Sequence, residues 1–285
     1  MKRGLAILLC LAWSGAALAA GPAAVRKRVQ ASMLLTGTIE VAPDGSVAQY
    51  ALDQPEKVPE AVKGLLTKSV ATWRFQPVEV DGKPMAAKAS MSVRVVASPL
   101  GNDNFSLGVT GAWFGDGASR QSDATTQTIS YKKRQMPRYP MDAAYSGVQG
   151  IVYVLLKIGR DGRVVDAAAE TVNLRVVASD EQLQVWRRVL AEAALTGLRH
   201  DTFNVPTAGP EAGKPYWVAR VPVTFQLNGG TPAGYGQWQA YVPGPVQEPD
   251  WADKDKLAGS PDAVPEGGIL LAEHSLRLLT PPGGS

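Results

Sequence analysis

The chain has 285 residues, and 29 Lys and Arg against 26 Asp and Glu give it a small net charge of +3. This balance provides no clustered basic surface for nucleic acid. The single cysteine, Cys10, excludes a disulfide framework, cysteine-based structural zinc and iron–sulfur chemistry. The length suits two small domains with connecting segments.

The first residues have the three-part pattern of a secretory signal peptide. Lys2 and Arg3 form a basic start, residues 5–13 are almost wholly apolar, and Ala17-Leu18-Ala19 supplies small residues for cleavage. We therefore expect a signal peptide over residues 1–19 and export to the periplasm. The alternative is a retained inner-membrane anchor, although the apolar run falls short of the roughly 20 residues that a spanning helix needs.

Residues 30–98 predict a small α+β unit, which we call module 1. Residues 35–41 alternate apolar and polar side chains, as in a half-buried strand, and Pro43-Asp44-Gly45 predicts a tight turn into a return strand. Residues 55–72 space their apolar side chains as an amphipathic helix does. Trp73-Arg74-Phe75 leads out of this helix, and residues 89–95 alternate again in a final strand.

Two stretches are too rich in Gly, Pro and small polar residues to bury much apolar surface. Residues 99–130 predict a linker, and residues 229–285, which we call the tail, predict loops or disorder. One short apolar segment, residues 269–279, interrupts the tail and could form a docked helix or a strand.

Residues 131–228 repeat the order of module 1, and we call them module 2. A strand from Gly150 to Ile158, an Asp161-Gly162 turn and a return strand precede a helix over residues 180–198, which Asp180 can cap. The last strand is residues 218–227. The sequence thus predicts two tandem units of strand, turn, strand, helix, loop and strand, in the α+β class.

Module 2 resembles the TonB C-terminal domain family. The likeness lies in the opening Pro137-Arg138-Tyr139-Pro140, the Asp161-Gly162-Arg163-Val164 turn, the Ala-rich helix end and the closing VPVTFQL of residues 221–227. Module 1 is a weaker, degenerate copy, with Trp73-Arg74-Phe75-Gln76-Pro77 as the better match to the family's aromatic helix exit. The resemblance implies, for each module, an antiparallel three-stranded sheet packed against helix.

The family also implies a function, namely binding in the periplasm to a short peptide of an outer-membrane transporter, which joins the sheet as an extra strand. In a full energy transducer, a membrane helix couples such a domain to a proton-driven inner-membrane complex. Here the N-terminal segment has no histidine and looks cleavable, and no long Pro-rich spacer follows it. The resemblance therefore favours a binding module linked to TonB-dependent transport over an energy transducer.

The last strand of module 2 is the principal candidate site. Pro222 has no amide hydrogen for a strand ladder, so this strand is expected at the edge of its sheet, where a partner peptide can pair. The alternative is that Pro222 merely protects the edge from aggregation. The binding interpretation requires an unpaired outer margin along the strand, with contacts from Val218, Arg220, Pro222, Thr224 and Gln226.

A second candidate surface is the lead-in to module 2. Arg138, Tyr139 and Pro140 could hold an exposed aromatic ring and a charge against a peptide, or Tyr139 could simply pack on the sheet. No catalytic motif, metal-ligand pattern or cofactor loop occurs, so neither an enzyme nor a cofactor is expected. The remaining alternatives are a membrane-anchored TonB-system transducer and a structural envelope protein whose modules pair with each other, within one chain or as a homo-oligomer.

Overall fold

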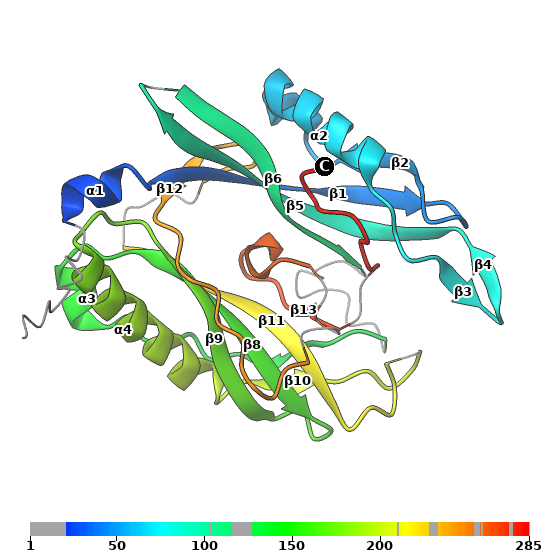
Figure 1. The fold of residues 1–285 in the computed structure, drawn as a ribbon. Helices are drawn as coiled ribbons and strands as arrows, with labels where there is room; N and C mark the ends of the chain where they lie inside the picture. The colour runs from blue at the N-terminus through cyan, green and yellow to red at the C-terminus, as the bar shows by residue number, and fades with distance from the viewer. Residues whose placement is uncertain are drawn as a thin grey trace, which may run out of the picture.

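The computed structural model describes residues 21–102, 104–115, 127–209, 211–227, 233–253, 257, 259–273 and 276–284. The predicted signal peptide, residues 1–19, lies outside the described residues. The fold is mixed α+β, and its strands pair in antiparallel fashion. Figure 1 shows two sheets lying one above the other, with α2 over the upper sheet, α4 against the lower one, and parts of the tail between them.

Module 1 places three strands in the order β2–β1–β5. β1 pairs with β2 and with β5, so β1 is the central strand, and Val62, Leu66 and Val70 of α2 are buried in the core of this module. The elements up to this point are α1 (Pro22–Arg26), β1 (Gln30–Val41), β2 (Val47–Leu52), η1 (Pro55–Lys57), α2 (Glu60–Thr72), β3 (Val78–Val80), β4 (Lys83–Met85) and β5 (Ala87–Gly101).

The predicted boundary of module 1 at residue 98 is wrong, and so is the first part of the linker predicted over residues 99–130; residues 116–126 of that linker lie outside the described residues. β5 continues to Gly101 and pairs with β6 (Asn104–Gly115), which extends the sheet by a further strand. The small residues that suggested a linker, such as Gly108, Gly111 and Ala112, lie inside this long hairpin. Because the tail buries one side of β6, this strand does not need a bulky side chain at every position. Its composition therefore gives no sign of a strand.

Module 2 has the same strand order, β9–β8–β11, with β8 as the central strand. Two short strands, β7 and β10, pair beside it. Its elements are β7 (Ser130–Lys133), α3 (Met141–Tyr145), β8 (Gly150–Gly159), β9 (Val164–Leu174), α4 (Asp180–Leu198), β10 (Thr202–Asn204) and β11 (Tyr216–Phe225).

The two Asp-Gly turns have the same local geometry. Gly45 has a φ of 82° and Gly162 a φ of 74°, a backbone conformation that favours glycine. The amide of Phe75 donates to the carbonyl of Gly45 over 2.8 Å, and the amide of Phe203 donates to that of Gly162 over 2.8 Å. Each turn is therefore hydrogen-bonded to a phenylalanine a few residues after the helix of its module. Phe75 and Phe203 occupy equivalent positions.

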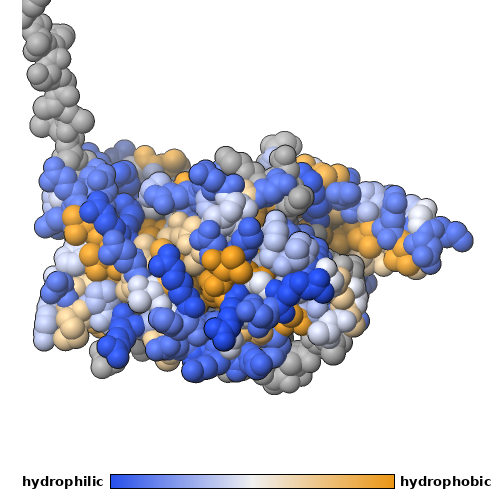
Figure 2. Space-filling model, turned by 90° about the horizontal axis from the view of Figure 1, so that it is seen from below, coloured by the Kyte–Doolittle hydropathy of each residue, from blue (hydrophilic) through white to orange (hydrophobic). Residues whose placement is uncertain are grey.

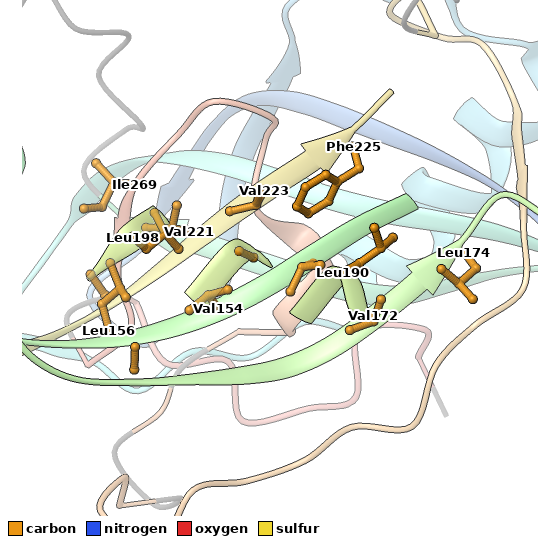
Figure 3. Close-up of a cluster of buried hydrophobic side chains, with 14 of the residues drawn as sticks. Val154, Leu156, Val172, Leu174, Leu190, Leu198, Val221, Val223, Phe225 and Ile269 are labelled. Carbon is orange, nitrogen blue, oxygen red and sulfur yellow. The ribbon is translucent and has the colours of Figure 1, made fainter. Parts of the chain in front are cut away.

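The core of module 2 lies between β8, β9, β11 and α4. Figure 3 shows Val154, Leu156, Val221 and Phe225 of the sheet on the same side as Leu190 of the helix. Helix α4 begins with a capping box, in which Ser179 accepts from the amide of Gln182 and Gln182 accepts from that of Ser179. Ser179, rather than the predicted Asp180, is the N-cap residue.

Polar groups join the facing sides of the two sheets. Arg94 of β5 donates to the Tyr153 hydroxyl of β8 over 3.2 Å and to the Asp262 carbonyl of the tail over 2.9 Å. Burial raises the pKa of Tyr153 to about 12, so this hydroxyl stays protonated at neutral pH. Hydrogen bonds between the facing sides of the two sheets thus join the modules. The tail also links an edge of each sheet, because Gln239–Tyr241 pairs with β1 and Val242 pairs with Leu174 of β9.

The tail is built into the fold, against the expectation of disorder. It forms β12 (Gln239–Tyr241) on β1, η2 (Pro261–Ala263) between the sheets and β13 (Leu270–Leu271) on β11. Val264, Leu270 and Ala272 are buried. A Gly- and Pro-rich segment can therefore contribute a core when two existing sheets supply most of the apolar surface.

Candidate functional site

The outer margin of β11 is taken in its first half by the tail. Ala219 pairs with Leu271 and Arg220 with Leu270, and the amide of Ala272 donates to the carbonyl of Val218 over 2.8 Å. The prediction that Val218 and Arg220 present an open edge is therefore wrong. The short apolar segment in the tail docks as a strand on the surface that was expected to be free.

Arg220 has a structural role in this arrangement. Its guanidinium forms two hydrogen bonds of 2.8 Å with the carboxylate of Glu170 and a third, of 3.1 Å, with the carbonyl of Gly259. Both side chains of the ion pair are only 3% exposed. Such a pair, satisfied on both sides and enclosed by the tail, cannot also read a partner peptide.

The second half of the β11 margin offers little backbone. Since Val218 turns its carbonyl toward the tail, the alternating pattern turns the backbone groups of Pro222 and Thr224 outward as well. Pro222 is buried and has no amide to donate there, which explains how proline fits in a long strand. Thr224 and Gln226 are half-buried, so a peptide would find one complete pairing position within the strand.

The lead-in residues divide between core and surface. The Tyr139 hydroxyl donates to the carbonyl of Val148 over 2.6 Å, and its ring meets Phe225 edge to face with centroids 5.4 Å apart. Burial raises the pKa of Tyr139. Tyr139 thus packs on the sheet, Pro140 precedes α3, and only Arg138 is exposed. The structure does not bring Tyr139 and Arg138 together as one contact surface.

A long groove runs between α4, β9 and the tail on the opposite side of the same sheet. Its volume is about 1270 Å³, large beside the roughly 300–1,000 Å³ of ordinary ligand pockets. Figure 2, which views the molecule from below, shows a mostly hydrophilic face with a small apolar patch near its middle. The residues that line the groove include Ala167, Ala168 and Ala169 of β9, Gln184, Arg187, Arg188, Ala191 and Leu195 of α4, and Pro243, Pro245, Gln247 and Pro249 of the tail.

The backbone margin of β9 forms part of this groove, and it is only half occupied. The amide and carbonyl of Leu174 both bond to Val242, and the amide of Gln247 donates to the carbonyl of Glu170 over 2.7 Å. Strand register turns the backbone of Ala167 and Ala169 outward too. In the described part of the chain, the outward backbone groups of Ala167 and Ala169 have one hydrogen-bond partner. This is the carboxylate of the neighbouring Asp166, which accepts from the Ala167 amide over 2.8 Å.

Charged side chains are placed along the groove unevenly. Arg28 pairs with Asp180 at the start of α4, and Arg187 donates to the carbonyls of Val172 and Pro243 over 3.2 and 2.9 Å. Burial lowers the pKa of Arg187, although it remains charged at neutral pH. Arg188 is exposed on the groove wall, and Glu248, which is also exposed, lines the groove as well. A carboxylate entering the groove would therefore meet this second arginine.

Sequence reasoning missed the groove. The signals were present: three alanines in succession within a strand, where bulky β-formers are usual, and prolines spaced through residues 243–249. Neither signal has meaning until the tail is known to lie beside β9. The pairing of Leu174 with Val242 joins residues whose separation in the chain gives no local pattern.

Among the described residues, no cluster of side chains could hold a metal ion, and no helix is long and apolar enough to cross a membrane. No family model, curated protein or solved structure matches this chain.

Proposed function

We propose that the protein is an exported, non-enzymatic binding protein of the bacterial envelope, built from two TonB C-terminal-like modules. In this proposal, module 2 binds an extended segment of an envelope protein, such as an outer-membrane transporter, along the open margin of β9. The strand order that both modules share, with one helix against each sheet, supports the family likeness. The site differs from the one expected, because the tail already covers β11.

The observation that carries this proposal is the half-filled margin of β9. The tail lies along Glu170 to Leu174 as an extended chain, which demonstrates that this margin accepts strand-like pairing. Beyond Glu170 the tail departs, and the groove continues past Ala169 and Ala167 with room for another chain. Main-chain hydrogen bonds would supply affinity, and the alanine-lined floor would select the side chains that fit.

The groove wall suggests what kind of segment fits. Ala168, Ala191 and Leu195 favour small or apolar side chains, whereas Arg188 favours an acidic one. An extended segment that combines apolar residues with an Asp or Glu is therefore the expected ligand.

In-cell photocross-linking tests this function. A photoreactive residue at Ala168 should capture an outer-membrane or periplasmic protein, whereas the same residue at Thr224 should not. Adding Gln184→Trp should abolish the cross-link, because Gln184 is exposed and lines the groove. Val185→Trp is the matched control on the next residue, which is 48% exposed and does not line the groove. Capture from Thr224 alone, or capture that survives Gln184→Trp, would refute the β9 site.

A structural envelope role is the second candidate, because the tail seals so much of both sheets. It predicts that no photoreactive position in the groove captures another protein, while removal of the tail destabilises the envelope. Determining the mature N-terminus tests export separately: a chain that begins after residue 19 supports a cleaved signal peptide, and an intact Met1 in the membrane fraction supports the anchored transducer.

A further inference from the structure

The far end of the β5–β6 hairpin exposes an apolar surface beyond the reach of α2. Leu100 is 69% exposed, Phe105 59% and Leu107 38%. Val109, two residues further along β6, is buried in the core of module 1. Figure 1 shows the hairpin projecting past the helix that covers the rest of this sheet.

Among the described residues, backbone partners for the outer margin of β6 lie along its second half. The amide of Ser260 donates to the carbonyl of Ala112 over 3.1 Å, and the amide of Leu276 donates to that of Phe114 over 2.9 Å. Between Arg94 and Val95 a bulge shifts the register, after which Phe105 lies opposite Pro99. Pro99 has no amide, which agrees with a pair that does not exchange hydrogen bonds, so the backbone groups of Phe105 and Leu107 point outward.

In the part of the chain that the structure describes, no covering segment lies along this part of the margin. Sheet edges are normally blunted by lysines, prolines or a covering segment. Residues 95–115 contain no lysine or arginine and a single charge, Asp103, which lies between β5 and β6 in the sequence, and β6 itself contains no proline. The described residues provide no partner for the outward groups of Phe105 and Leu107. By contrast, the tail covers the first half of β11, half of β9 and the second half of β6.

We propose that this margin pairs with the same margin of a second copy of the chain. An antiparallel arrangement with its two-fold axis at Ser106 places Phe105 opposite Leu107 of the second copy, and Leu107 opposite its Phe105. Each of these pairs exchanges both backbone hydrogen bonds, and each brings an aromatic ring against a leucine. The contact is isologous, because the same surface serves on both sides.

Two features favour a second copy over an unrelated strand. The residues at the axis, Phe105, Ser106 and Leu107, are uncharged, and Asp103 is the single charge in residues 95–115. An axis at Ser106 places the two copies of Asp103 on opposite sides of it, so like charges do not lie directly opposite each other in the paired segment. The alternation of Phe105 and Leu107 about Ser106 also makes the strand complementary to itself. The paired region is short, so we expect a weak dimer that forms with rising concentration. This inference does not depend on the proposed β9 site.

Sedimentation of the mature chain over a range of concentrations tests the proposal. The wild type should shift from monomer to dimer as the concentration rises. Leu107→Lys should stay monomeric, because each copy would bring a lysine into the short paired segment. Val80→Lys is the matched control, because Val80 is also an exposed apolar strand residue (54%, against 38% for Leu107) and lies on the separate β3–β4 hairpin. Melting curves should show that both variants are folded.

A cysteine at the axis gives a second, independent measurement. Ser106→Cys should form a disulfide-linked dimer, because residues at a non-hydrogen-bonded position across the axis are about 4.5 Å apart, within disulfide range. Ala48→Cys, on the exposed edge strand β2, should remain largely uncross-linked. A wild type that stays monomeric throughout, a dimer that survives Leu107→Lys, or equal cross-linking of the two cysteine variants would overturn the proposal.

Discussion

The two modules share a turn and a helix exit but complete their cores from different directions. In module 1, Trp73 and Phe75 meet Phe114 of β6 edge to face, with centroids 5.1 and 4.9 Å apart. In module 2 the position equivalent to Trp73 holds Asp201, and Phe203 meets Tyr131 of β7 at 5.1 Å. One module closes its core with a strand that follows the helix exit, and the other with a strand that precedes its sheet.

The difference shows that the repeated topology determines the strand order, the turn and the helix, whereas segments outside the repeat supply the side chains that complete each core. The Gly45 and Gly162 turns are alike because each must fit against the backbone of one phenylalanine. The residue two positions earlier is free to be an indole or a carboxylate, provided that a neighbouring segment accommodates it. Module 2 thereby acquires buried ionisable groups that module 1 lacks at the same place.

The largest effect is expected from the ion pair behind β11. Glu170→Ala leaves the Arg220 guanidinium buried without its counter-charge, which should lower the free energy of unfolding by about 3–5 kcal/mol. Denaturant unfolding measures this loss. The double variant Glu170→Gln with Arg220→Met removes both charges and should recover most of it. A Glu170→Ala variant as stable as the wild type would show that this pair does not hold the sheet.

The equivalence of the turns can be tested by adding one methyl group to each. A Cβ at Gly45 would lie 2.1 Å from the Phe75 carbonyl oxygen, and one at Gly162 would lie 2.1 Å from that of Phe203. Gly45→Ala and Gly162→Ala should each destabilise the protein by about 2–3 kcal/mol. Gly82→Ala is the control, with a φ of 72° but open space around it, and should cost only about 1–2 kcal/mol. Unequal losses at the two turns would break the comparison.

The carboxylate that replaces the indole should make module 2 sensitive to pH. Burial raises the pKa of Asp201, partly offset by the Gln135 amide, which donates to its Oδ1 over 2.6 Å, and by nearby Arg134 and His200. Because the folded state binds this proton more tightly, the stability it contributes is present below the ordinary Asp pKa and declines as the pH rises through the raised value. Unfolding should show Asp201→Asn gaining on the wild type with increasing pH. A difference that does not change with pH would contradict this.

The smallest effect is expected at the helix starts. Ser179→Ala removes the capping box of α4 and should destabilise the protein by about 1 kcal/mol, measured by chemical denaturation. Helix α2 begins after Pro59, which makes no side-chain cap, so Pro59→Ala should have less effect on that helix. A larger loss at Pro59 would mean that the α2 start depends on the fixed backbone of proline.

Much of the frame could be predicted from sequence, because its signals are local. The alternation around Leu35, the apolar run around Val152, the Asp-Gly turns and the spacing of apolar residues in both helices each act within a few residues. Pro222 predicted that β11 lies at the edge of its sheet, but β13 pairs with the first half of this strand. The segment that covers the outer margin of β11 could not be predicted. Leu270 and Leu271 lie some fifty positions away in the chain, and no sequence pattern indicates that they pair with β11.

The candidate site was misplaced for the same reason. An exposed edge is defined by what does not lie beside it, and a short apolar run such as residues 269–279 gives no sign of where it docks. The hairpin of β5 and β6 was hidden for another reason. Gly108, Gly111 and Ala112 look like linker residues, yet they suit a strand whose margin is approached closely by Ser260 and its neighbours.

The position of the tail in the chain has a consequence for biogenesis. Synthesis from the N-terminus delivers both sheets before residues 239–284 emerge, so the margins of β1, β6, β9 and β11 that these residues cover are exposed in the interval. In a nascent chain at this stage the strand margins are unpaired, and holding chaperones would have to shield them until the tail is synthesised. Docking of the tail on both sheets is then the last step of folding, and it joins the two modules.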